Sequence, residues 1–366
     1  MSLVLDKVRR DVGGEAHIRD VSLTLENGVI NVLLGPTQSG KTSLMRLMAG
    51  LDRPSAGSIV MNGRDVTALP LRDRSVAMVY QQFINYPNFT VFENIASPLR
   101  VAGVAPSEIE ERVHDAARLL KLEPYLDRQP LQLSGGQQQR TAIARALVKR
   151  ADLVLLDEPL ANLDYKLREE LREELPRLFG ASGAVFVYAT TDPAEALLLG
   201  GRTATLHEGQ VTQFGATPEV YRRPQDLATA RTFSDPPLNE LKAEKRVQLV
   251  TLDTGARFGA IGAFSGVPDG SYTVAFRAHH LFIEPPGTDA IALPSVVSVA
   301  EITGSETFIH VDLRAGERDH RLVVQLAGVR RYEPGAALNL YIDPHRLFLF
   351  DDAGRLTAAP DVARAA

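Results

Sequence analysis

Almost continuous apolar runs alternate with helical patterns along the first two thirds of the chain. The runs are VINVLLG (29–35), AMVYQ (77–81), ADLVLLDE (151–158) and AVFVYAT (184–190). Such strands are typical of a sheet that helices cover on both faces. Between them, residues 107–122 predict an amphipathic helix, with Ser107 and Glu110 at capping-box spacing. The pattern predicts an α/β domain over residues 1–234.

The pattern changes at SDPPLNELK (234–242), where two prolines interrupt the chain. The segments that follow are short and alternating: SYTVAF, FIHVDL, HRLVVQL, LNLYI and RLFLF. Turn residues separate them, as in small all-β barrels. We therefore expect a second domain, a β-barrel, over residues 235–366.

Composition narrows the classes of protein. A length of 366 residues favours two domains, and a net charge of −5 argues against a nucleic-acid partner. The absence of cysteine excludes disulfides and thiolate metal sites. The sequence contains no signal-peptide pattern and no apolar run long enough to span a membrane, so we expect a cytoplasmic protein.

The stretch GPTQSGKT (35–42) follows a predicted strand and fits the phosphate-loop pattern G-x-x-x-x-G-K-[ST]. In this pattern backbone N–H groups and a helix N-terminus surround phosphates. Lys41 is expected to reach the β- and γ-phosphates, and Thr42 to ligate Mg²⁺. The predicted phosphate-binding residues are Gly35, Pro36, Thr37, Gln38, Ser39, Gly40, Lys41 and Thr42. The expected ligands are ATP and Mg²⁺.

An acidic pair ends the third apolar run, LVLLDE (153–158). Asp157 stands where P-loop enzymes place a Mg²⁺-coordinating carboxylate. Glu158 beside it is the candidate general base for the attacking water. An acidic pair after a strand is often only a solvated turn, but the phosphate loop in the same chain favours the catalytic interpretation.

LSGGQQQR (133–140) predicts a second glycine-rich helix N-terminus, and hence a second phosphate-binding surface. Here the chain resembles the ATP-binding-cassette (ABC) ATPases, whose signature is LSGGQ. The resemblance extends to Gln81 in VYQQF, like the family's glutamine loop and a Mg²⁺ contact, and to Asp164 in ANLD, like its aspartate loop. It implies a P-loop cassette with a helical insert at about 85–150.

The β region resembles the regulatory, OB-like (TOBE-type) barrels of carbohydrate-importer ATPases of the maltose and glycerol-3-phosphate kind. VAFRAHHLFI (274–283), GSETFIHVDL (304–313) and YIDPHRLFLFD (341–351) carry that likeness. YPNFTVFENI (86–95) is similar to the surface through which such cassettes touch their membrane subunits.

By this resemblance, two cassettes sandwich two ATP molecules head to tail. Ser134, Gly135, Gly136 and Gln137 of each chain would serve the ATP held by the other chain. The implied assembly contains two membrane permease subunits and a periplasmic or lipid-anchored solute-binding protein. It places the chain peripherally on the cytoplasmic face of the inner membrane, as a transport ATPase of enzyme class EC 7.

Two positions depart from the family pattern. Thr191, in Thr190-Thr191-Asp192, stands where the family normally has a histidine that contacts the γ-phosphate. Val12 stands where an aromatic residue usually stacks on adenine, and the first Phe, Tyr or Trp of the chain is Tyr80. His17 and Arg9 are the nearby candidates to replace that ring in part.

Both departures affect the half-site that binds this chain's own ATP, whereas LSGGQ is intact. The favoured hypothesis is therefore an asymmetric pair with a different ATPase subunit, in an importer of a carbohydrate or polyol such as glycerol. The alternatives are a homodimer that tolerates threonine and a mainly ATP-binding regulatory subunit. A soluble cassette of DNA repair or translation is disfavoured, because the chain has neither long coiled coils nor a second cassette.

Overall fold

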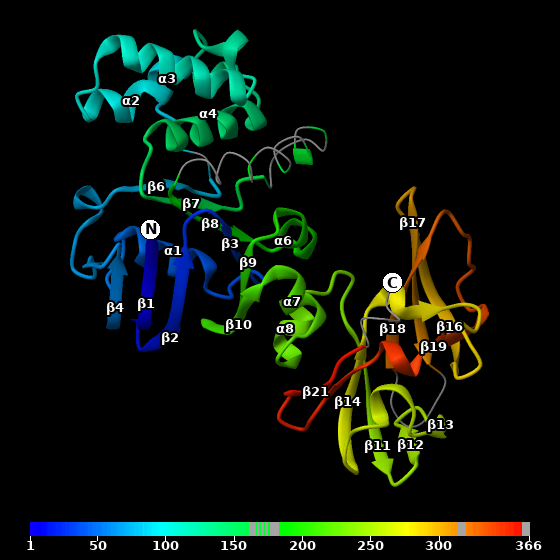
Figure 1. The fold of residues 1–366 in the computed structure, drawn as a ribbon. Coiled ribbons are helices and arrows are strands. Elements are labelled where there is room, and N and C mark those ends of the chain that lie inside the picture. The colour runs from blue at the N-terminus through cyan, green and yellow to red at the C-terminus, as the bar shows by residue number, and fades with distance from the viewer. Residues whose placement is uncertain are drawn as a thin grey trace. The chain divides into compact units, whose positions relative to one another are not determined.

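The computed structural model describes residues 1–360 except 83, 161–165, 167, 170–171, 173–174, 176–182 and 314–319. Internal contacts divide the chain into two compact units, Met1–Pro218 and Glu219–Ala366. The division falls earlier along the chain than the proline break at 234 that the pattern suggests. The helices and strands of both units are shown in Figure 1.

The centre of the first unit is a six-stranded sheet with the order β10-β9-β3-β8-β7-β6. Its strands are β10 (Gln210–Ala216), β9 (Arg202–His207), β3 (Ile30–Leu34), β8 (Val185–Thr190), β7 (Leu153–Asp157) and β6 (Val76–Val79). All neighbours are parallel except β10, which pairs antiparallel with β9 at one edge. β3, β7 and β8 are buried along their whole length, as their apolar sequences predict.

A second sheet of the first unit is antiparallel, with the order β2-β1-β4-β5. Its strands are β1 (Ser2–Val12), β2 (Glu15–Glu26), β4 (Ala56–Met61) and β5 (Arg64–Asp65). Both sheets contribute to one hydrophobic core, in which Leu5 and Leu25 from one sheet and Leu33 from the other are buried together with α1. This core holds the β1–β2 hairpin beside the segment that joins β3 to α1.

The helices of the first unit fall into two groups (Figure 1). α2 (Val91–Val101), α3 (Pro106–Leu119) and α4 (Gly135–Val148) pack on one another, within the range predicted for the helical insert. α1 (Lys41–Ala49) follows β3, and α6 (Pro193–Leu199) follows β8. Short 3-10 turns span Leu71–Asp73, Glu123–Tyr125 and Pro130–Gln132, and α7 (Thr217–Arg222) crosses the division between the units.

The expected capping box at Ser107 and Glu110 is wrong. α3 begins one residue earlier, with Pro106 in the first turn and Ala105 as N-cap, and no side chain caps it. Proline fits the first helical position because its fixed φ is helical and its missing N–H is not needed there.

The second unit contains two antiparallel sheets. One has the order β13-β12-β11-β14-β20-β21 and the other β15-β19-β16-β17-β18. The strands are β11 (Asn239–Arg246), β12 (Leu249–Leu252), β13 (Arg257–Gly259), β14 (Gly270–Phe276), β15 (Leu281–Phe282), β16 (Ile291–Ile302), β17 (Glu306–Leu313), β18 (His320–Ala327), β19 (Ala337–Ile342), β20 (Phe348–Phe350) and β21 (Leu356–Ala358). Side chains of both sheets share one core, among them Phe276, Ile309 and Leu340.

The remaining short elements of the second unit are α8 (Leu227–Thr232) and the 3-10 turns Gly262–Phe264, Ala278–His280 and Pro344–Arg346. Ala230 of α8 packs with Phe348 and Phe350 of β20 in a small separate cluster. In the parts of both units that the structure describes, no helix is long and apolar enough to cross a bilayer.

Candidate nucleotide-binding site

The segment Gly35–Thr42 joins the carboxyl end of β3 to α1, where open α/β sheets bind ligands. Gly40 is the N-cap of α1 and has a φ of 102°, in the left-handed region. A Cβ atom on Gly40 would also lie 3.3 Å from Gly209 Cα and 3.4 Å from the His17 carbonyl oxygen. Only glycine meets both demands without strain, so the loop can close tightly against β2 and the β9–β10 turn.

Lys41 points into this loop. Its Nζ donates hydrogen bonds to the carbonyl oxygens of Gly35, at 2.8 Å, and Pro36, at 3.1 Å, and lies 3.9 Å from Glu158 Oε1. Burial lowers the pKa of Lys41, while the negative charges of Glu158 and Asp157 oppose that shift. A buried ammonium held inside a loop of backbone amides is suited to bind the terminal phosphates of a nucleotide.

Thr42 and Asp157 meet at the start of α1. The Thr42 hydroxyl donates a 2.8 Å hydrogen bond to Asp157 Oδ2. Burial raises the pKa of Asp157, and the bond from Thr42 and the charge of Lys41 partly offset it. These two oxygen donors, which sequence spacing predicts to ligate Mg²⁺, therefore lie side by side although 115 residues separate them.

Glu158 follows β7 and contacts Gln81. The Gln81 amide donates a 2.8 Å hydrogen bond to Glu158 Oε2. Glu158 has a φ of 48°, and its backbone N–H bonds the Ala189 carbonyl oxygen of β8 at 3.0 Å. Left-handed backbone at a glutamate is strained and clusters at functional sites. Burial raises the pKa of Glu158, Lys41 opposes the rise, and Asp157 and Glu195 add to it.

An open cleft of about 800 Å³ unites these groups. Its lining includes Thr37, Gln38, Gly40, Lys41 and Thr42 from the phosphate loop, together with Gln81, Glu158 and Thr191. Gly35, Pro36, Ser39 and Asp157 are not part of that lining; Gly35, Ser39 and Asp157 are buried, whereas Pro36 is exposed. The structure thus gathers at one cleft residues that the sequence distributes over four segments.

The far end of the cleft is lined by Glu15, Ala16 and His17, with Arg19, Glu208 and Gly209. His17 was a candidate from the sequence, and its neighbours were not. Arg9, the other candidate, is not part of the lining and pairs with Asp11 at 3.0 Å. Val12 is exposed at the end of the β1–β2 hairpin and does not line the cleft. Nothing in the sequence marks Glu208 and Gly209, which the β9–β10 turn brings in.

Thr191 follows β8 and is exposed on the wall of the cleft. Within the described chain, the structure gives its side chain no hydrogen-bond partner. Its neighbours are fixed: the Thr190 carbonyl oxygen accepts a 3.3 Å bond from the Gly35 N–H, and the Asp192 side chain caps α6 by accepting from the Ala194 N–H at 2.8 Å. Thr191 is therefore held at the wall by its backbone.

The LSGGQ segment begins α4. Ser134 is the N-cap, and it forms a reciprocal capping box with Gln137, through bonds of 3.3 Å and 2.9 Å. Ser134 and Gly135 are exposed, and no residue of 134–137 lines the cleft of its own chain. Asp164, in the predicted aspartate loop, lies outside the described residues.

The residues present fit a magnesium ion that is shared with nucleotide phosphates. Among the described residues no group of three or more histidine, aspartate or glutamate side chains could hold a metal alone. Mg²⁺ typically takes one or two carboxylates together with substrate phosphates and water. The Thr42 hydroxyl and the Asp157 carboxylate provide part of such a set of oxygen ligands. The side-chain carbonyl oxygen of Gln81 can add a third, because the side-chain nitrogen of Gln81 already donates to Glu158.

A mostly parallel sheet, a phosphate loop between β3 and a helix, and an acidic pair at the end of β7, which β8 separates from β3, define a P-loop nucleotide-binding protein. Residues 18–161 match the ABC transporter family, and residues 274–350 match the TOBE domain. The solved dimeric structure of a post-hydrolysis state of the ATP-binding cassette MJ0796, bound to ADP and Pi, is 29% identical with a TM-score of 0.53. The match covers 59% of this chain and 98% of the solved cassette chain.

Whole-length relatives include sn-glycerol-3-phosphate import ATP-binding proteins named UgpC. The protein of Ruegeria pomeroyi is 37% identical over 350 residues, covering 96% of this chain and 97% of the relative. The protein of Escherichia coli K12 is 35% identical over 352 residues, covering 95% of this chain and 97% of the relative. The chain belongs to the family of ABC transporter ATP-binding proteins and is an ATP-hydrolysing transport ATPase with a TOBE domain.

Proposed function

We propose that the chain powers a bacterial importer of sn-glycerol 3-phosphate or a related carbohydrate or polyol, as one half of an asymmetric ATPase pair. Relatives matched over 95–97% of this chain support the importer class and its cargo. The cleft supports the asymmetry, because Thr191 lines the same cleft as Glu158 and its side chain has no hydrogen-bonding partner among the described residues.

In this proposal the phosphate loop and Lys41 bind the β- and γ-phosphates. Thr42, Asp157 and Gln81 hold Mg²⁺, which supplies charge neutralisation to the phosphates when bound. Glu158 accepts a proton from the attacking water, and its raised pKa brings its basicity nearer to neutral pH. Gln81, which bonds Glu158 at 2.8 Å, orients that carboxylate.

Thr191 is the weak component of this arrangement. A histidine at this position would offer a longer side chain and a preorganised donor to the γ-phosphate. Threonine cannot carry a positive charge, and loss of one preorganised donor typically costs about 10²–10³ in rate. Turnover of this chain's own ATP is therefore slow, while Ser134, Gly135, Gly136 and Gln137 complete the site of the opposite subunit.

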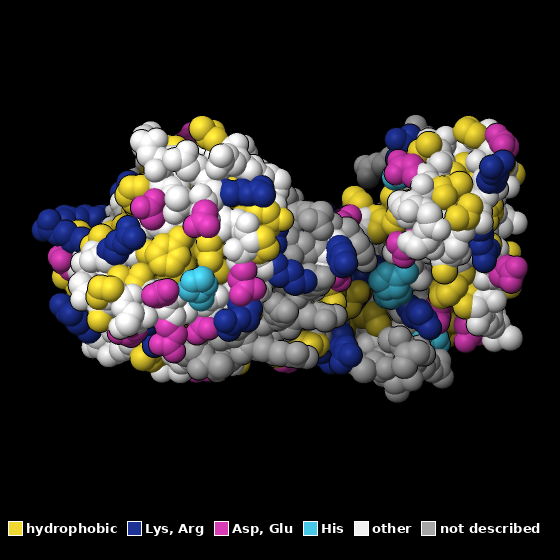
Figure 2. Space-filling model, turned by 90° about the horizontal axis from the view of Figure 1, so that it is seen from above, with side chains coloured by type: hydrophobic (Ala, Val, Ile, Leu, Met, Phe, Trp, Pro, Cys, Tyr) yellow, Lys and Arg dark blue, Asp and Glu magenta, His cyan; other side chains and the backbone are white. Residues whose placement is uncertain are grey.

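The partners in this proposal are a second ATPase subunit, two membrane permease subunits and a solute-binding protein, at the cytoplasmic face of the membrane. Ile84, Tyr86 and Phe89 are exposed hydrophobic side chains just before α2, and Tyr86 and Phe89 pack with ring centroids 5.3 Å apart. Seen from the side of α2 and α3, hydrophobic side chains also gather between charged ones on the cassette (Figure 2). This apolar surface suits contact with the permease subunits.

The test is steady-state ATP turnover by the purified chain and by Thr191→His at high protein concentration. The proposal expects an almost silent native chain and a rise of about tenfold or more in the variant. An active native chain that histidine changes little would instead establish a homodimeric ATPase that tolerates threonine. Uptake assays with reconstituted permease subunits and radiolabelled sn-glycerol 3-phosphate test the cargo separately.

A further inference from the structure

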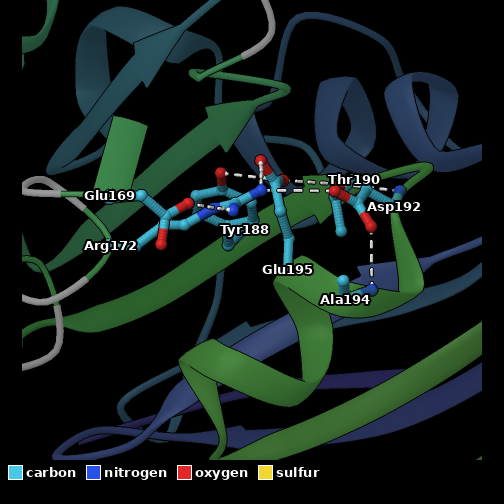
Figure 3. Close-up of polar contacts among 7 residues, drawn as sticks. All are labelled: Glu169, Arg172, Tyr188, Thr190, Asp192, Ala194 and Glu195. Atoms are coloured by element: carbon cyan, nitrogen blue, oxygen red, sulfur yellow. Dashed lines mark hydrogen bonds and ion pairs between the residues drawn. The ribbon is translucent and has the colours of Figure 1, made fainter. Parts of the chain in front are cut away.

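A buried carboxylate lies directly behind the turn that carries Thr191. Glu195 of α6 is 6% exposed, and its Oε2 atom accepts hydrogen bonds from the Tyr188 hydroxyl at 3.1 Å and the Thr190 hydroxyl at 2.7 Å. Figure 3 shows Glu195 in the middle of a chain of polar contacts that runs along the carboxyl end of β8. Glu195 therefore holds both ends of the strand segment that precedes Thr191.

Arg172 completes this network (Figure 3). Its guanidinium donates to Glu195 Oε1 at 3.1 Å, to Asp192 Oδ2 at 3.2 Å and to Glu169 Oε1 at 2.6 Å. The Arg172 side chain is 11% exposed and Glu195 is buried, so solvent screens the charge-assisted bond between these two only weakly. Thr191 thus lies between two residues, Thr190 and Asp192, that the network fixes.

The same strand end contacts the catalytic groups through its backbone. The carbonyl oxygen of Ala189 accepts from the Glu158 N–H at 3.0 Å, and that of Thr190 accepts from the Gly35 N–H at 3.3 Å. A displacement of Thr190 would therefore move the first residue of the phosphate loop as well as the Thr191 wall. Displacements of about 1 Å in positioning groups can cost two orders of magnitude in rate.

We propose that Arg172 and Glu195 are positioning residues for ATP hydrolysis, which hold the Thr190–Thr191–Asp192 turn against the γ-phosphate end of the cleft. They touch neither the cleft nor its ligand and act through the carboxyl end of β8. The inference rests on the established ATPase class, and on the proposed role of Thr191 only for the part that acts through that side chain.

The alternative is that the pair only stabilises the cassette. Removing one member of a buried ion pair leaves an uncompensated charge and destabilises the fold, which would lower turnover indirectly. The double variant Arg172→Met/Glu195→Gln avoids that orphaned charge, and Arg172→Lys retains the charge without the planar, multidentate geometry. Arg46→Met is the matched control, because it removes a 2.7 Å ion pair with Asp52 from the same cassette away from the cleft.

The experiment first compares turnover of the native chain and Thr191→His, and then makes these variants in whichever of the two has the higher turnover. For each variant it measures kcat, KM for ATP and Tm. We expect kcat to fall about tenfold or more in Arg172→Met, Glu195→Gln and the double variant, while KM changes less than twofold. The double variant should lose no more than either single variant, because both act through one contact. Arg172→Lys should recover part of kcat, and Arg46→Met should retain it.

Backbone amide NMR shifts of Gly35 and Thr191 provide a readout that does not depend on turnover. They should move in Arg172→Met and not in Arg46→Met. Unchanged kcat and unchanged shifts in folded variants, or a kcat loss that only follows Tm, would overturn the inference. If Thr191→His has no effect but Arg172→Met still lowers kcat, the role proposed for Thr191 fails and the positioning acts through Gly35 and Glu158.

Discussion

At the scale of single residues, the part of the cleft lined by β2 carries charged side chains, and the described residues that line the cleft include no Phe, Tyr or Trp. Glu15, Ala16, His17 and Arg19 of β2 all line this part of the cleft, because the pairing with β1 shifts register there and places an extra residue, His17, on β2. Val12 is paired in register with Glu15 across the hairpin, and directly opposed residues share a face. Val12 therefore points to the side of the sheet that lines the cleft, but its side chain is too short to take part.

Val12→Tyr should tighten ATP binding by about tenfold, because a base stacked on an aromatic ring is worth about 1–3 kcal/mol. Fluorescence titration of a nucleotide analogue, displaced by ATP, measures the affinity. Val12→Leu enlarges the side chain without adding a ring and should bind like the native chain. Equal gains in both variants would indicate simple packing rather than stacking.

Sequence motifs identify the site residues whose positions are set by the backbone of their own loop or strand. Lys41 and Thr42 follow from the phosphate-loop spacing, and Asp157 follows from the end of a buried strand. The contact of Arg172 with Glu195 joins residues 23 apart whose charges look like ordinary solvated helix faces in the sequence. Pairings of this kind depend on how a helix lies on the sheet, which residue spacing does not encode.

At the scale of elements, two helices of the cassette begin with the same reciprocal cap. Thr90 and Glu93 cap α2 through bonds of 3.1 Å and 2.9 Å, and Ser134 and Gln137 cap α4 in the same way. Each cap satisfies two backbone N–H donors at a helix N-terminus. Only the cap of α4 belongs to the LSGGQ segment. Comparing variants of the two caps therefore distinguishes a role in helix stability from the proposed role in nucleotide contact.

Ser134→Ala and Thr90→Ala should each lower stability by about 1 kcal/mol, the usual value of an N-cap. Thermal or urea unfolding checks that equality. At temperatures where both variants are folded, Ser134→Ala should also reduce ATP turnover in the dimer, whereas Thr90→Ala should not. Equal turnover in the two variants would argue that Ser134 serves only α4.

The elements themselves were predicted to different degrees. β3, β7 and β8 were expected within two residues, because a strand buried on both faces is continuously apolar. The sheet of β1, β2, β4 and β5 was missed. β1 contains register shifts between Leu5 and Val8 and between Val8 and Arg10, and Lys7 has a φ of 47°. Such bulges break the alternation of period two by which a half-buried strand is recognised.

At the scale of the whole molecule, no residue of 134–137 lines the cleft of its own chain. A complete site in the proposed head-to-tail assembly therefore needs two chains, one contributing Lys41 and the other Ser134. Activity should then depend on association, and defects in the two half-sites should complement each other.

Lys41→Ala and Ser134→Arg should each be inactive alone, at concentrations where the chain self-associates. A one-to-one mixture should recover about a quarter of the reference turnover, because half of the dimers are hybrids with one intact site. The reference is native chain or Thr191→His, whichever is more active, with both variants made in that background. A mixture as inactive as its components would contradict a site shared between chains.

The two backbone bonds at the end of β8 have a consequence for exchange with solvent. The amides of Gly35 and Glu158 both end on that strand, at 3.3 Å and 3.0 Å. Neither proton can exchange with deuterium until its segment separates from β8, so the two labels report opening of the site from opposite sides. If both amides open together, the phosphate loop and the catalytic carboxylate form one cooperative unit whose opening free energy is set by a central strand rather than by a surface loop.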